Sequence, residues 1–173
     1  MSRRSSSLFL FLGLIIPDLA LGLPDDREQP IQLEADRAQY DRTSGISVYE
    51  GDVAITQGTM RLAADKVTVY TKDSVFQRLE ALGNPATFAY QPTPEKGLIN
   101  GEGEHLQYDA TTAQVIIRSN AKITQAGDIF TGNRIEYDLA NDVVKASSGE
   151  NNTDRVHITI QPKATETTGV NGR

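Results

Sequence analysis

Two histidines, His105 and His157, are the first candidates for catalysis or metal binding. They lie far apart in the sequence, and neither falls in an HExxH pattern or another spacing typical of zinc ligands. The chain has no cysteine, so thiolate ligands and disulfides are excluded. His105 stands where related segments carry Arg or Lys, and His157 lies between two apolar residues on the polar face of a predicted strand. We interpret both as surface residues and predict no metal site and no cofactor.

Four polar residues recur at corresponding places: Asp36, Asp65, Glu104 and Asn133. One of them is an amide, which cannot act as a general acid. Their recurrence favours structural hydrogen bonding by short polar side chains over catalysis. A glycosidase-like carboxylate pair stays open from spacing alone, for example in a right-handed β-helix acting on polysaccharide. Such enzymes need acidic and basic side chains clustered on one outer face, which this sequence does not show, and we predict no enzymatic activity.

The recurrence belongs to a longer internal repeat. Residues 39–70 and 107–138 align without a gap at an offset of 68, with QYD on QYD and ITQ on ITQ. The four polar residues mark shorter units, spaced by 29, 39 and 29 residues. The ten extra residues of the middle spacing, QPTPEKGLIN at 91–100, contain two prolines and a glycine and predict an inserted loop. Repeats of this length indicate stacked units in which each contacts its neighbours.

Apolar residues alternate with polar ones through most of the chain after the first two dozen residues, which is typical of half-buried strands. No stretch of this part shows a helical period. Gly51-Asp52, Gly83-Asn84 and Ser119-Asn120 are predicted to form turns between short strands. The sequence therefore predicts an all-β protein whose inward side chains form either a solid core or a partly open apolar trough, and alternation alone leaves both open.

The first 22 residues have the composition of a secretory signal peptide. Arg3 and Arg4 precede an apolar run at 8–16, and small residues follow at 20–22. A membrane anchor is the alternative, but the run is far shorter than the ~20 residues of a spanning helix. We expect an exported protein, most naturally in the bacterial periplasm, with one domain at 23–160 and a disordered tail at 161–173.

The net charge of −6 becomes −7 without the first 22 residues, which hold two of the 17 basic and one of the 23 acidic residues. An acidic chain argues against nucleic acid as a partner. An amphipathic anionic ligand would have to be held by its apolar part.

Five motifs, taken in order, carry a resemblance to a known family. They are QPIQLEAD, YEGDVAITQGTMRLAADKV, GNPATF, GEGEHLQYD and FTGNRIEYD. Together they resemble the OstA-like family of periplasmic lipopolysaccharide-transport proteins, over about residues 29–162. Each motif is weak alone, and their order makes the resemblance specific. It implies an antiparallel β-jellyroll, partly open, with a hydrophobic interior that takes the acyl chains of lipid A. A ligand-free β-scaffold in the periplasm is the alternative.

The resemblance also implies site residues and partners. Its lipid-contacting positions match Ile31, Phe88 and Tyr108, and alternation adds further inward apolar residues. The predicted lipid-binding set is Ile31, Leu33, Val53, Ile55, Met60, Val67, Phe88, Tyr108, Ile123 and Tyr137. Family members join end to end and to related jellyrolls in inner-membrane and outer-membrane complexes. The predicted edge-strand assembly residues are Ile31, Gln32, Leu33, Glu34, Val156, His157, Ile158, Thr159 and Ile160.

Overall fold

The computed structural model describes residues 29–93, 96–149 and 155–162, and these form ten β-strands. The predicted signal peptide and all but two residues of the predicted tail lie outside the described residues. The strands are β1 (Gln32–Glu34), β2 (Arg37–Asp41), β3 (Ile46–Gln57), β4 (Met60–Lys72), β5 (Val75–Tyr90), β6 (Ile99–Asp109), β7 (Gln114–Gln125), β8 (Asp128–Asp138), β9 (Val143–Ser147) and β10 (His157–Thr159). The prediction of an all-β protein is confirmed.

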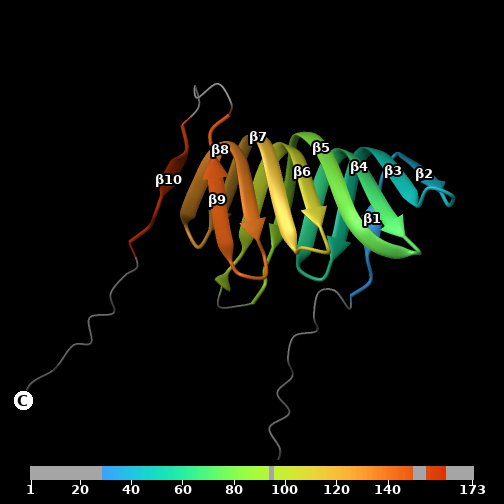
Figure 1. Ribbon diagram of the computed structural model, residues 1–173, viewed down its shortest axis with the longest axis horizontal. Coiled ribbons are helices and arrows are strands. Elements are labelled where there is room, and N and C mark those ends of the chain that lie inside the picture. Colours follow the sequence, from blue (N-terminus) through green and yellow to red (C-terminus); the bar gives the residue numbers. More distant parts are fainter. Residues whose placement is uncertain (1–28, 94–95, 150–154, 163–173) are drawn as a thin grey trace, which may run out of the picture.

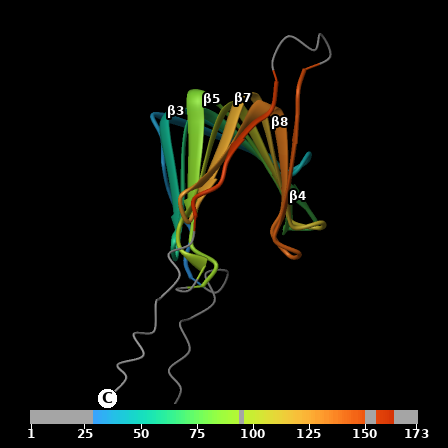
Figure 2. The ribbon, with the colours of Figure 1, turned by 90° about the vertical axis from the view of Figure 1, so that its left-hand side faces the viewer.

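All ten strands belong to one antiparallel sheet with the order β1-β3-β4-β5-β6-β7-β8-β10 (Figure 1). Strand β2 also pairs with β3, beside β1, and strand β9 also pairs with β8, beside β10. Seen from one end, the sheet is folded lengthwise into two arms that meet along a bend (Figure 2). We call the arm that begins with β1 and ends with β10 arm A, and the arm that begins with β2 and ends with β9 arm B. Strands β3 to β8 run through both arms.

The bend is made by irregularities inside the long strands. The pairing register shifts between Glu50 and Val53 in β3, and similar shifts occur in every later pair up to β7–β8. Gly51 and Asp52 have positive φ there, as do Ser119 and Asn120 in β7. Such residues bend a strand where an extra residue is left out of the ladder. The prediction that these pairs and Gly83-Asn84 are turns between short strands is therefore wrong, because all three pairs lie within single strands of 12 or 16 residues.

The recurring polar residues also lie at or beside this bend. Asp36 donates its backbone N–H to Gly51 O at 3.0 Å, and its carboxylate lies directly against Gly51. Asn120 donates its side-chain amide to Glu104 Oε1 at 2.8 Å. Asp65 and Asn133 occupy the corresponding places in β4 and β8. These residues repeat because the bend repeats.

Three hairpins at the free end of arm B use the aspartate that follows Tyr in the repeat. Asp41, Asp109 and Asp138 each accept hydrogen bonds at Oδ1 from the backbone N–H groups two and three residues later, at 2.8–3.4 Å. Bonds from nearby side chains and from these N–H groups hold the pKa of each carboxyl below its usual value. The YD repeat thus closes the turns.

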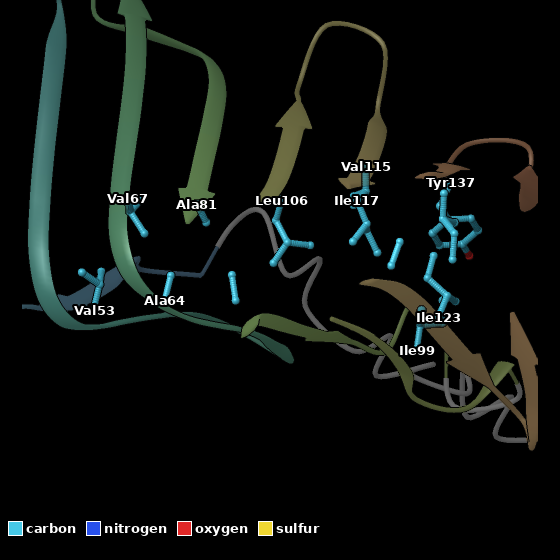
Figure 3. Packing of buried hydrophobic residues seen from close by; sticks show 13 residues of the cluster. Val53, Ala64, Val67, Ala81, Ile99, Leu106, Val115, Ile117, Ile123 and Tyr137 are labelled. Carbon is cyan, nitrogen blue, oxygen red and sulfur yellow. The ribbon is translucent and has the colours of Figure 1, made fainter. Parts of the chain in front are cut away.

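The two arms face each other with their apolar sides, and the core lies between them along the bend. Figure 3 shows Val67, Ala81, Leu106, Ile117 and Tyr137 from arm B opposite Val53, Ala64, Ile99 and Ile123 from arm A. The outer faces are polar and carry ion pairs such as Lys66–Glu50 at 2.9 Å and Arg134–Glu136 at 2.8 Å. The inward and outward faces predicted from alternation are confirmed.

Candidate functional site

A single row of inward residues crosses the whole of arm A. Each member is the direct cross-strand partner of the next, from β1 at one edge of the sheet to β10 at the other. We call this set the apolar row: Leu33, Ile55, Leu62, Phe88, Gly101, Ile123, Phe130 and Ile158. It contains no polar side chain, so this row of the inner face is apolar from β1 to β10.

Arm B faces it with a comparable row at a similar distance from the bend. Most of its members are apolar or aromatic: Tyr40, Ser47, Val69, Leu79, Tyr108, Val115, Tyr137 and Val144. The Tyr108 ring stacks on Phe76 with the ring centroids 6.0 Å apart. Two facing apolar walls suit an elongated hydrocarbon ligand better than a compact polar one.

The burial of residues on the inner face depends on their distance from the bend. Residues next to the bend, such as Val53, Val67 and Ile117, are fully buried and form the core. Farther from the bend, Ile55, Leu62 and Phe88 on arm A are only half-buried. The half-buried residues are those that could contact a ligand without displacing the core.

Two inner residues in the half of the sheet nearer β10 are more buried than their repeat counterparts in the other half. Ile123, the repeat counterpart of half-buried Ile55, is fully buried. Tyr137 is 2% exposed and donates its hydroxyl to Asp142 Oδ1 at 2.7 Å. Burial raises the pKa of Tyr137 above its ordinary value, and the hydrogen bond to Asp142 adds to this effect.

The structure places the sequence-predicted lipid-binding residues in four groups. Four of them lie in the apolar row: Leu33, Ile55, Phe88 and Ile123. Val53 and Val67 are core residues at the bend, whereas Met60, Tyr108 and Tyr137 line the walls away from it. Ile31 precedes β1 and is exposed.

Sequence reasoning did not select four residues that the structure adds to these walls. Leu62, Gly101 and Phe130 complete the apolar row, and Phe76 stacks on Tyr108. Alternation carried the signal for Leu62, which shares a face with Met60. Gly101 has no side chain to count, and its inward position follows only from its partners Phe88 and Ile123.

The polar candidates do not come together as a catalytic site. His105 lies in β6 between Leu82 and Arg118, and His157 is exposed on β10, three strands away in the sheet. Within the described ranges, no three His, Asp or Glu side chains are arranged to hold a metal ion. The recurring carboxylates serve the bend, as described above.

A hollow of about 400 Å³ lies on the outer face of arm A. Most of its lining residues alternate with the apolar row along the strands, but Ile55, Leu62, Phe88 and Gly101 of that row also line it. Small residues such as Ala54, Ala63 and Ala89 line it together with Arg61, Glu102 and Lys122. Lys122 and Glu102 pair at 3.1 Å. The hollow and the apolar row therefore share residues of β3 to β6.

Comparison with known proteins identifies what this architecture is. Residues 32–143 match the model of the family described as the LptA/(LptD N-terminal domain) LPS transport proteins. The chain belongs to this family. The matched range begins with β1 and ends where β9 begins, so it includes both arms and nearly all of the apolar row.

Curated and solved members of the LptA family align with almost the whole chain. The lipopolysaccharide export system protein LptH of Pseudomonas aeruginosa is 37% identical over 170 residues, covering 93% of this chain and 97% of the relative. LptA of Escherichia coli K12 is 31% identical over 145 residues, covering 79% and 77%. The crystal structure of Pseudomonas aeruginosa LptH superposes with a TM-score of 0.73 and 34% identity, covering 80% of this chain and all of that one.

The resemblance found in the sequence is therefore confirmed, and the fold is the open antiparallel jellyroll of the LptA family. No helix in the part of the chain that the structure describes has the length and apolar character needed to cross a membrane.

Proposed function

We propose that this protein transports lipopolysaccharide by holding its acyl chains between the two arms. The observation that carries the proposal is the apolar row, which runs without a polar interruption from β1 to β10. The family match and the export names of the relatives support the same function. The sugars and phosphates stay in water outside the arms, which is consistent with an acidic chain.

The energetics fit a carrier of lipid. Burial of one methylene is worth about 0.8 kcal/mol, so exposing an acyl chain of roughly a dozen methylenes costs on the order of 10 kcal/mol. A lipid with several chains therefore cannot cross water unaided. A row that stays apolar along its length keeps the free energy nearly level, and a lipid can be displaced onward by the next one. Transport is the function of this architecture, and it needs no catalytic group.

Photo-crosslinking tests the position of the lipid. A photoreactive residue at Phe88, irradiated with purified lipopolysaccharide, is expected to give lipid adducts because Phe88 is half-buried in the apolar row. Lys66 and Arg134 are the controls, since both pair with carboxylates on the outer faces. Adducts at Phe88 alone support the groove. Equal adducts at all three positions, or none at Phe88, would favour a ligand-free scaffold.

The sheet edges are suited to assembly. Strands β1 and β10 lie at opposite ends of the same arm, and both end the hydrogen-bonded order. Unpaired strand edges add to neighbouring sheets through backbone hydrogen bonds. Joining β10 of one molecule to β1 of the next would continue the apolar row from Ile158 to Leu33. We propose such head-to-tail joining, and similar joints to related jellyrolls of inner-membrane and outer-membrane complexes, as a bridge across the periplasm.

Added charge at β10 tests this joint. Ile158 and Ile160 are 54% and 69% exposed, so replacing both by lysine leaves the monomer folded. We expect self-association to weaken at least about tenfold, because charged edges oppose strand addition. Sedimentation velocity over a range of concentrations measures the effect. Val143→Lys, on the β9 edge of arm B and 42% exposed, is the matched control; equal weakening by this variant would argue against the β10 joint.

A further inference from the structure

The two halves of the molecule differ at places that the repeat makes equivalent. At the offset of 68, Val69 corresponds to Tyr137 and Ser74 to Asp142. The first pair cannot form the hydroxyl–carboxylate contact that the second pair makes at 2.7 Å. The half nearer β10 therefore contains a polar contact that its repeat counterpart lacks.

The inserted loop supplies a third group to this contact. The loop between β5 and β6 lies at the free end of arm A. The other two hairpins at this end, β3–β4 and β7–β8, turn through two residues each. Lys96 in this loop lies 3.0 Å from Asp142 Oδ2, and Asp142 belongs to the β8–β9 turn at the end of arm B. The ion pair thus joins the free ends of the two arms. Tyr137, then Lys96, hold the pKa of Asp142 below its usual value, so the carboxylate is charged at neutral pH.

Burial agrees with closure at this place. Ile99 lies at the end of β6 next to the loop, far from the bend, yet it is 0% exposed. Ile123 is equally buried beside it, whereas Ile55, Leu62 and Phe88 in the half nearer β1 are half-buried. Acyl chains can reach Ile123 only if the arm ends separate.

We infer that Tyr137, Asp142 and Lys96 form a latch that holds the β10-side half of the groove closed in the empty protein, and that this latch opens when lipid advances along the apolar row. The inference rests on the proposed function for its lipid step, but the closed state is a property of the empty protein. The ion pair is suited to reversible opening, because Lys96 and Asp142 side chains are 45% and 34% exposed and an exposed pair is weak. The half nearer β1, without the latch, is the side that admits lipid.

Spin labels on the two arms test the latch. The chain has no cysteine, so cysteines introduced at Ala126 on arm A and Thr112 on arm B are labelled uniquely. Double electron–electron resonance on the protein without lipid is expected to show one narrow distribution of the distance between the labels at Ala126 and Thr112. Asp142→Asn and Lys96→Gln should each raise the separated population about two- to fivefold, the range typical of an exposed ion pair. Lys96→Arg, which keeps the positive charge, should retain the narrow distance distribution of the unsubstituted protein.

A second label pair and a lipid titration separate the outcomes. Labels at Arg61 and Lys72, at the two ends of β4, report the half without the latch and should not respond to either substitution. Purified lipopolysaccharide should widen the Ala126–Thr112 distance. An unchanged distance distribution in both charge-removing variants overturns the latch. Lipid capture at Phe130, the apolar-row residue of β8 in the latched half, without widening also overturns it. Failure of lipid to bind any variant would instead contradict the proposed function, while the empty-protein distances still decide the latch.

Discussion

Gly101→Val is expected to reduce lipid capture at least about tenfold while leaving the protein folded. Gly101 lies in the apolar row between Phe88 and Ile123, and the Phe88 ring rests directly on its backbone. A Cβ built at Gly101 would overlap the edge of this ring, with Cδ1 at 2.6 Å. Because Phe88 is half-buried, the ring can rotate away from Gly101, and it then enters the space that an acyl chain needs.

Capture is measured with a photoreactive residue at Leu62, the cross-strand partner of Phe88 on its other side. Asn100→Val is the matched control, because Asn100 is the preceding residue on β6 and points to the exposed outer face. Circular dichroism and thermal unfolding verify that both variants fold. Normal capture by Gly101→Val would show that lipid does not pass along this part of the row.

Ile117→Ala is expected to lower the free energy of unfolding by about 2–5 kcal/mol. Ile117 is fully buried at the bend, where it packs between Leu106 and Ile135 on the neighbouring strands. Truncation removes apolar contacts and leaves a cavity that two facing arms cannot easily close. Urea unfolding with an unchanged m-value measures the loss.

Ile116→Ala is the control within the same strand. Its side chain points to the outer face between Gln107 and Glu136 and is only half-buried, so we expect a loss below about 1 kcal/mol. Similar losses for the two variants would mean that the packing between the arms contributes little to stability.

The fold could be predicted from the sequence wherever burial has a period of two. Alternation correctly placed Ile55, Phe88 and Ile135 on the inner face because one face of each strand packs against the opposite arm. It failed at Gly51-Asp52 and Ser119-Asn120, since residues with positive φ serve hairpin turns and bulges alike. Only the partner strand, which continues past the irregularity, distinguishes the two.

The sequence predicted which face of each strand lines the candidate site, but it did not predict how deeply each of these residues is buried. Val53 and Ile55 alternate identically in sequence, yet one is core and the other lines the wall, because depth depends on where the opposite arm lies. The contact of Lys96 with Asp142 was missed for the same reason, since the two residues are brought together only by folding. Its available signal was the inserted loop and the change from Val69 to Tyr137 between repeats.

The passage of β3 to β8 through both arms gives the molecule a fixed unit of length. Neighbouring strands are about 4.8 Å apart, so each strand adds that distance to both walls at once. The 68-residue repeat carries β3 onto β7, four strands along the sheet, and corresponds to about 19 Å of wall. Duplication of this unit would lengthen the molecule by four strands at a time while keeping its cross-section. The number of repeats in the sequence therefore sets the length that a single copy spans.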